Sequence, residues 1–331
     1  MQRSAASLMR SLHGLFPVYK PPGFTWKNVR DTLQMKLLKE LNSIKRCSSS
    51  QPLLFLPEGS EGSSGVELAK VVTCVASLPK EIPSLPSLVN HELVKGPAYN
   101  WLKIGVGHKL DRLSSGVLVF GIRDGAKLLS SMYENHYTRD YTVCGTFGKA
   151  TADFTDGGKI IEKTTFNHIT RDKLERIIAM IQGSNQKAML THSHIDLKSQ
   201  EAYDLAVQGK LRPKVKTPPL ILGMRCLEFS LPDFTLEIQC MHETQQHLRK
   251  TIHEIGLELR STAVCTKVRR TRDGPFTLDS ALTHVHWDVD SLCRAIKECK
   301  ASVEEMYKEN IDLFLQNAKA EELLTSDVRS Q

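Results

Sequence analysis

The 331-residue sequence lacks several patterns that would place it in a common class of protein. No apolar run reaches the roughly 18 residues that a membrane-spanning helix requires, so the sequence predicts no membrane span. A phosphate-binding P-loop string is absent. The string from Gly105 to Gly107 begins like a dinucleotide fingerprint but misses its last glycine, because Leu110 takes that place. The sequence therefore indicates no nucleotide cofactor.

Clusters of metal ligands are also scarce. No two of the eight cysteines form a Cys-x-x-Cys pair, and several lie in apolar runs, which is typical of reduced, buried side chains. The pairs His192/His194 and His284/His286 each put two imidazoles on one side of an expected strand, but a third ligand at metal spacing is missing. We therefore expect no metal site. A metal-dependent nucleic-acid enzyme using these pairs is the weakest alternative.

Acidic residues are absent before Asp31. In a helical projection Arg3 and Arg10 fall on one side. The other side is apolar: Leu8, Leu12, Leu15 and Phe16. A basic amphipathic helix without acidic residues is typical of a mitochondrial transit segment. We assign residues 1–16 to such a segment and expect the protein in the mitochondrial matrix, with a frayed N-terminal arm as the alternative.

The overall charge points to a class of partner. Lysine and arginine number 44 against 37 acidic residues, which gives a formal charge of +7. This excess favours a polyanionic partner without naming one. The length predicts two domains, or one large domain with appendages.

Helical and strand patterns alternate without a strict order. Helices are predicted over residues 29–41, 172–182 (capped by Gly183), 201–208 and 244–259, and strands over 116–122, 141–147, 190–197, 220–229 and 234–240. Residues 42–66 have the composition of a flexible insertion, and the pattern from 291 to 331 is helical and charged. This order predicts an α+β fold with a mixed, mostly antiparallel central sheet flanked by helices.

Three side chains and one basic cluster are candidates for chemistry. Asp111 lies in a glycine-punctuated loop between cations, which favours its ionised form as a nucleophile, although a turn aspartate is the commoner explanation. Tyr141 opens a strand, where most tyrosines keep the hydroxyl at the rim. Arg249 borders an apolar helix face, where arginine either follows the core edge or pairs with a carboxylate. Residues 267–272 hold four cations, dense enough for contact with a phosphate backbone, although a solvated loop is nearly as common.

Taken in order, these strings resemble the TruB family of pseudouridine synthases. Residues 19–25 resemble its N-terminal Lys-Pro motif, 105–119 its catalytic loop, 139–157 its tyrosine-bearing strand, 201–206 its short middle helix, and 236–277 its C-terminal core. The resemblance covers roughly residues 15–285 and is strongest to the mitochondrial branch, which includes an mRNA-acting paralogue. It implies a catalytic domain over 17–290, between the transit-like segment and a C-terminal extension over 291–331.

The resemblance also implies an activity and its residues. The enzyme would isomerise uridine to pseudouridine in mitochondrial RNA, with mRNA favoured and tRNA and rRNA as the other candidates, without cofactor or metal. Asp111 would attack the sugar or the ring, Tyr141 would stack on the flipped base, and Arg249 would pair with Asp111. RNA contacts are assigned to basic side chains of these motifs: Lys20, Lys109, Arg112, Lys267, Arg269, Arg270 and Arg272. Other mitochondrial RNA-processing proteins are expected as further partners.

Two departures from the family pattern keep a second function open. Val106 stands at the position usual for histidine, and His247 stands where an aromatic residue is usual. These changes favour a non-catalytic RNA-binding or mitoribosome-assembly factor that keeps the synthase fold. Activity on defined RNA separates the two.

Overall fold

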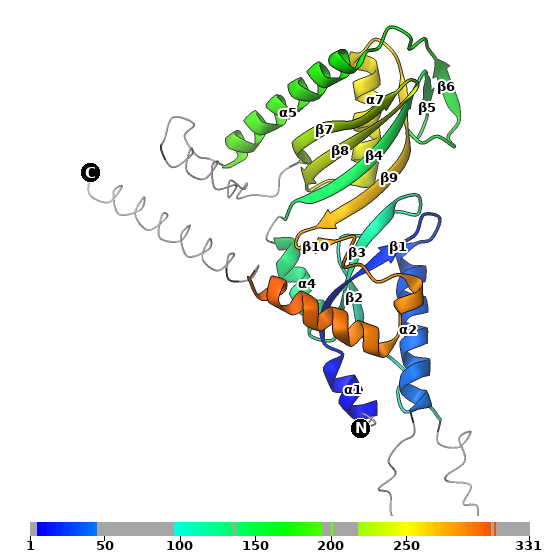
Figure 1. Cartoon of the computed structure of the whole chain (residues 1–331), viewed down its shortest axis with the longest axis vertical. Coiled ribbons are helices and arrows are strands. Elements are labelled where there is room, and N and C mark those ends of the chain that lie inside the picture. The colour runs from blue at the N-terminus through cyan, green and yellow to red at the C-terminus, as the bar shows by residue number, and fades with distance from the viewer. Residues whose placement is uncertain are drawn as a thin grey trace, which may run out of the picture.

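One eight-stranded sheet runs along the long axis of the molecule (Figure 1). A computed structural model describes residues 5–44, 96–134, 137–193, 200, 218–305 and 308. The strand order is β1-β3-β9-β4-β8-β7, with β2 on β3 and β10 on β9. Every pairing in this sheet is antiparallel except that of β3 with β9. The predicted mixed α+β class is confirmed.

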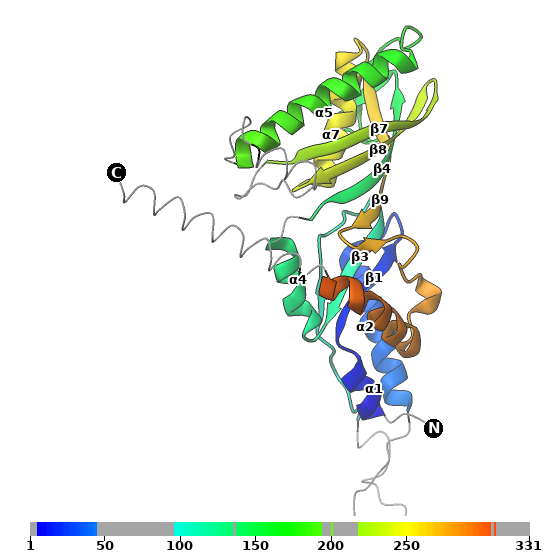
Figure 2. The same cartoon turned by 60° about the vertical axis from the view of Figure 1, so that its left-hand side comes forward.

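The half of the sheet nearest the N-terminus is built from β1 (Gly14–Lys20), β2 (Ile104–Val106) and β3 (Ser115–Ile122). Around it lie α1 (Ala5–Ser11), α2 (Trp26–Ser43), α4 (Gly125–Glu134) and a helix over residues 289–305 (Figures 1 and 2). Thr25 caps α2, because its hydroxyl accepts a hydrogen bond from the Asn28 amide at 3.2 Å. The buried face of α2 contains Val29, Leu33, Leu37 and Leu41, which all lie in the helix predicted over residues 29–41.

The other half contains β4 (Arg139–Phe147), β7 (Leu220–Ser230), β8 (Asp233–Met241), β9 (Ala263–Asp273) and β10 (Phe276–Thr277). The strands predicted over 220–229 and 234–240 are β7 and β8, which pair antiparallel as a hairpin. Helices α5 (Arg171–Ser193) and α7 (Gln245–Glu258) cover this half (Figure 2). A small separate sheet joins β5 (Lys149–Thr151) to β6 (Ile160–Lys163).

The two halves meet where β3 runs parallel to β9 over only two residue pairs. Gly116 forms one of these pairs with Arg270, and its φ of +116° is one that L side chains rarely adopt. A Cβ at this position would lie 2.1 Å from the Arg270 carbonyl oxygen. The junction therefore requires glycine.

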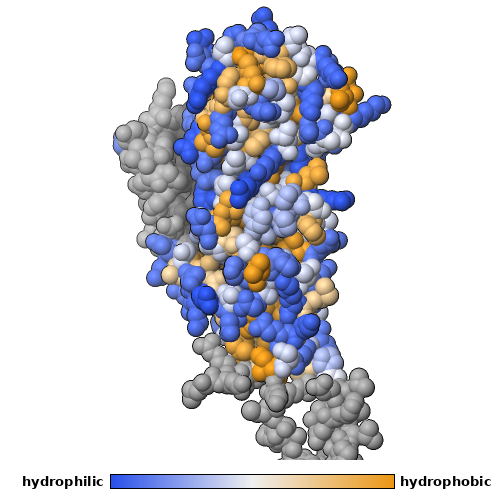
Figure 3. Space-filling view, turned by 45° about the vertical axis from the view of Figure 1, so that its right-hand side comes forward, coloured by the Kyte–Doolittle hydropathy of each residue, from blue (hydrophilic) through white to orange (hydrophobic). Residues whose placement is uncertain are grey.

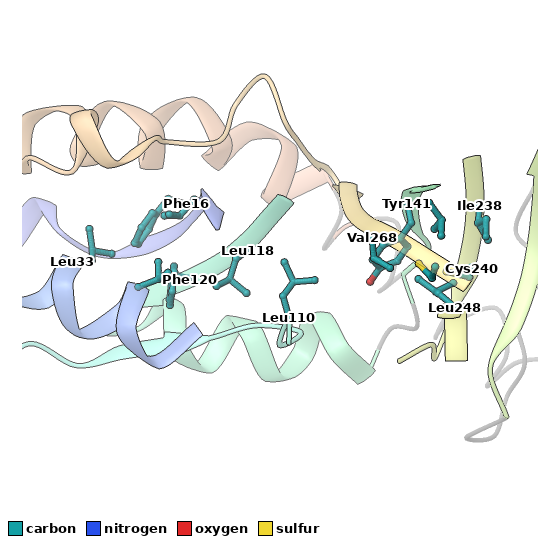
Figure 4. Close-up of a cluster of buried hydrophobic side chains, with 14 of the residues drawn as sticks. Phe16, Leu33, Leu110, Leu118, Phe120, Tyr141, Ile238, Cys240, Leu248 and Val268 are labelled. Carbon is teal, nitrogen blue, oxygen red and sulfur yellow. The ribbon is translucent and has the colours of Figure 1, made fainter. Parts of the chain in front are cut away.

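A continuous hydrophobic core crosses this junction (Figure 4). Phe16, Leu33 and Phe120 pack in the first half, and Ile238 and Leu248 in the second. Figure 3 shows a mostly hydrophilic face on which apolar residues form small, separate patches. Among the described helices, none is long and apolar enough to cross a bilayer.

Three predictions about local structure are wrong. α5 continues through Gly183 to Ser193, so this glycine does not cap the helix and the strand predicted from residue 190 begins inside a helix. His284 and His286 lie in a 3₁₀ turn and not on a strand. The predicted helix over 201–208 and most of the insertion over 42–66 lie outside the described residues.

The segment boundaries also differ from those predicted. The boundary after residue 16 falls inside β1, and Leu12 and Phe16 are completely buried. The C-terminal extension begins within the helix over 289–305, whose Leu292 is also completely buried. Both terminal segments thus contribute side chains to the common core.

Candidate active site

The site is centred on Asp111, in the loop that connects β2 to β3. Arg249 of α7 donates a hydrogen bond from Nη1 to Asp111 Oδ2 at 2.5 Å and another from Nη2 to the Ser114 hydroxyl at 3.0 Å. The Ser114 amide donates to Asp111 Oδ1 at 2.8 Å. The loop and α7 belong to different halves of the sheet, so the fold places this pair at their junction.

The environment keeps Asp111 ionised. Burial alone would raise the pKa of its carboxyl, but the hydrogen bonds from Arg249 and Ser114 outweigh burial and hold the pKa below its ordinary value. The Asp111 side chain is 35% exposed, whereas that of Arg249 is 9% exposed. The carboxylate is therefore charged and accessible, and the guanidinium that orients it is enclosed by protein.

Backbone contacts fix the position of the Asp111 loop. Lys20 Nζ donates to the Ser114 carbonyl oxygen at 2.5 Å, and the Gly23 amide donates to the Arg112 carbonyl oxygen at 2.8 Å. The Lys20 side chain is completely buried and holds the loop, so its predicted contact with RNA stays a prediction that would require the side chain to become exposed. Burial lowers the pKa of Lys20 to about 8, while the nearby Asp111 acts in the opposite direction.

Arg270 holds the start of the same loop from within the protein. Its Nη2 donates to the His108 carbonyl oxygen at 2.8 Å, its Nη1 lies 2.9 Å from His108 Nδ1, and its Nε donates to the Val117 carbonyl oxygen at 2.7 Å. Arg270 is completely buried, so its predicted contact with RNA also stays a prediction that would require the side chain to become exposed. Arginine has no acceptor, so Nδ1 of His108 accepts and the imidazole is neutral. Burial, then Arg139 and Arg270, lower the pKa of His108 to about 2.

Tyr141 lies in a buried polar network beside this loop. Its hydroxyl donates to Glu243 Oε1 at 2.6 Å, and Glu243 also accepts from Arg139, whose Nε donates to Asp273 at 3.1 Å. Burial and the Glu243 carboxylate raise the pKa of Tyr141 well above its ordinary value, so the phenol is protonated. The expectation of a hydroxyl at the rim is wrong, because the Tyr141 side chain is completely buried. Figure 4 shows it among Cys240, Leu248 and Val268.

A cavity of about 340 Å³ adjoins the Asp111–Arg249 pair. It is lined by Arg249, by Leu113 from the Asp111 loop, and by residues of β9 and of the turn after β5, among them Asp153, Asp156 and Lys267. Neither Asp111 nor Tyr141 is among its lining residues, so the pair adjoins the cavity through Arg249. The structure thus brings Asp111 and Arg249 into contact and places Tyr141 in the packed layer beside them.

The remaining predicted RNA contacts fall into two groups. Lys109, Arg112 and Lys267 are exposed. Arg272 is half-buried and donates from both Nε and Nη2 to the Asp140 carboxylate, while Arg269 lies 5.7 Å from the Tyr19 ring. Of the cations over residues 267–272, Lys267 is therefore the one whose charge faces solvent freely.

Ser114 and Glu243 are two residues of the site that the sequence did not predict. Ser114 lies three residues after Asp111, the spacing at which a backbone amide returns to an aspartate side chain, and this pattern is a usable signal. Glu243 has no comparable signal, because its partners Arg139 and Tyr141 lie about a hundred residues away in the chain. Within the described residues, no group of three or more histidine, cysteine or acidic side chains could hold a metal ion.

Comparison with known proteins gives a consistent assignment. Residues 97–246 match the N-terminal domain of the TruB family pseudouridylate synthases. The chain is 62% identical to the mitochondrial pseudouridylate synthase TRUB2 of Xenopus tropicalis, over 94% of this chain and 93% of that protein. The Homo sapiens TRUB2 is 54% identical over 90% and 87% of the two chains, and the Homo sapiens TRUB1 is 31% identical over 60% and 57%. Since the match spans the Asp111 loop and nearly all of the chain aligns with one synthase, this chain belongs to the TruB family of pseudouridylate synthases.

Proposed function

We propose that this synthase converts uridine to pseudouridine in mitochondrial RNA, with mRNA favoured over tRNA and rRNA. The observation that carries the proposal is the ionised, partly exposed Asp111 held by the enclosed Arg249. Support for the compartment comes from the relatives named mitochondrial and from the basic amphipathic N-terminus, which favour import into the matrix.

The reaction needs one nucleophile and control of protons. The bond between N1 of uracil and C1′ of the ribose breaks, the base rotates and a bond from C5 to C1′ forms. C5 loses a proton and N1 gains one, so the product is an isomer of the substrate, and any bond formed to the carboxylate is broken again before the product leaves. Asp111 attacks the sugar or the ring, or stabilises charge there, while Arg249 keeps the carboxylate ionised and oriented. Bond positions change but the oxidation state does not, so these groups need no redox cofactor.

The target base must leave its stack to reach Asp111. In the proposed complex the flipped uracil stacks on Tyr141, whose protonated hydroxyl assists proton transfer at C5. Because the Tyr141 ring is completely buried here, this contact requires the side chains that cover it to move when RNA binds. Glu243 holds the hydroxyl until then.

The first test replaces the nucleophile. Asp111→Asn keeps the size of the side chain but removes its charge, so pseudouridine formation in defined RNA should fall by at least 10³-fold while RNA affinity stays within about threefold. Asp172→Asn is the matched control, because Asp172 is exposed in the first turn of α5, which contributes no residue to this cavity. Chemical detection of pseudouridine at wild-type levels in the Asp111 variant would overturn the assignment.

The same assay addresses the non-catalytic alternative favoured by Val106 and His247. A wild-type protein that binds mitochondrial RNA tightly but forms no pseudouridine in it would be an RNA-binding or mitoribosome-assembly factor. Mapping pseudouridines in mitochondrial RNA with and without this protein then identifies the modified RNA.

A further inference from the structure

A cluster of cations surrounds one aromatic ring beside the Asp111 loop. The charged groups of Lys27, Arg30 and Lys109 lie 5.7, 5.4 and 5.1 Å from the centre of the Trp26 ring. Trp26 is half-buried and packs against the core, so it fixes the three cations around a rigid centre. We call Trp26, Lys27, Arg30 and Lys109 the Trp26 cluster.

One of these cations lies in an unfavourable position. Lys27 lies in the first turn of α2, which contains no acidic residue, and Arg30 follows in the next turn. The N-terminus of a helix carries partial positive charge, so a cation in the first turn is unfavourable there. Asp31 pairs with Arg30 at 2.8 Å, so it offsets one of the three positive charges. An anionic ligand would offset the others.

The cluster is attached directly to the catalytic loop. Lys109 is two residues before Asp111 in the chain, and its carbonyl oxygen accepts a hydrogen bond from Gln245 of α7 at 3.3 Å. On the other side, Arg112 Nε donates to the Gly23 carbonyl oxygen at 3.1 Å. The next residue, Phe24, is 53% exposed although it is a large apolar side chain. An exposed aromatic ring thus directly follows a residue that is hydrogen-bonded to the loop.

We infer that the Trp26 cluster, with Phe24 and Arg112, binds the unpaired RNA segment that flanks the target uridine. The cations contact successive phosphates and Phe24 stacks on a base. Single-stranded RNA suits this combination, because its bases are free to stack while a duplex offers only its backbone. The inference rests on the proposed function, since it places the RNA by its distance from Asp111.

The test measures binding of the full chain to a labelled 20-nucleotide RNA without self-complementarity, and to the same RNA annealed to its complement. Lys27→Gln with Arg30→Gln should weaken single-strand binding about tenfold at 0.1 M salt and reduce the slope of log K against log[salt] by about 1.4. Phe24→Ser should weaken binding about tenfold with the slope unchanged. The double variant removes a charge that is unfavourable in the first turn of α2, so it should fold normally.

The control is Lys39→Gln with Lys127→Gln, which removes the same charge from exposed positions on α2 and α4. The inference would be overturned if the control weakened single-strand binding as much as Lys27→Gln with Arg30→Gln does. It would also be overturned if that double variant and Phe24→Ser each weakened duplex and single-strand binding equally. Failure of the proposed function is a separate outcome, because the wild-type chain would then bind this RNA with the expected slope yet form no pseudouridine in mitochondrial RNA.

Discussion

The shape of the Arg249 side chain matters as much as its charge. Its guanidinium donates to Asp111 and to Ser114 at the same time, from two nitrogens fixed in one plane. Lysine has one ammonium and cannot reproduce this fork, so Arg249→Lys should reduce pseudouridine formation at least 100-fold although the charge is kept. Single-turnover rates at saturating RNA measure this effect. A rate within threefold of wild type would show that charge alone suffices.

His108 makes the folded protein sensitive to mild acid. In the unfolded chain histidine binds a proton near pH 6.5, but in the fold its pKa is about 2, so between these values the unfolded state holds the extra proton. The contribution of His108 to the free energy of unfolding is complete above pH 6.5. Below that pH it falls by up to about 1.4 kcal/mol per pH unit.

The variant His108→Asn should flatten this dependence between pH 6.5 and 4.5, as measured by urea unfolding. Asp111 acts in a lower window, because its pKa is lowered and its contribution is lost only as the pH falls through that value. His247, whose pKa burial also lowers, stays in both proteins and cancels in the comparison. Identical pH profiles for variant and wild type would show that His108 is not held neutral.

Among the elements, the short pairing of β3 with β9 is required for the site, because it joins the two halves of the sheet that carry Asp111 and Arg249. Gly116→Ala puts a Cβ against the Arg270 backbone and strains a positive φ, so the free energy of unfolding should fall by about 3 kcal/mol or more. Because Arg270 also holds the Asp111 loop, activity should fall in the molecules that still fold.

Gly183→Ala is the matched control for this substitution. Gly183 lies inside α5, where an added Cβ meets no atom within 4 Å. Alanine should therefore raise the free energy of unfolding by about 0.5–1 kcal/mol. A loss of stability at Gly183 would mean that α5 ends at this residue, as the sequence pattern alone suggested.

Some helices and strands can be predicted from the local sequence pattern, and others cannot. Helix α2 and strands β7 and β8 follow from local periodicity and turn residues. The sequence predicts the bounds of each to within a few residues. The predicted helix over 172–182 is shorter than α5, because glycine is common just after the end of a helix. Helix α5 continues because packing against β7 outweighs the small intrinsic cost of one glycine.

For the whole molecule, the N-terminal segment has two uses that can be separated. The import signal we propose needs the basic side of the helix, whereas the fold uses its apolar side, since Leu8 and Leu12 are buried in the core. Leu12→Ala should lower the free energy of unfolding by about 2–5 kcal/mol. Arg3→Gln with Arg10→Gln should leave stability within about 0.5 kcal/mol but abolish import of a fluorescent fusion of the full chain.

Thermal unfolding of the purified variants and microscopy of the fusions measure the two effects. Wild-type stability of Leu12→Ala would show that this helix does not pack against the core. Normal import of the double arginine variant would remove the targeting role and leave only the structural one.

The sequence by itself determined the family and the fold class and singled out Asp111 and Arg249 as candidates, because these depend on ordered motifs and on periodicities that are local in the chain. Only the tertiary structure decided which cations face solvent. Lys20 and Arg270 look like surface residues in the sequence, yet both are buried and hold the Asp111 loop. The reason is physical: the burial of a side chain depends on neighbours that are distant in sequence, such as Val117 and Arg270, which are 153 positions apart.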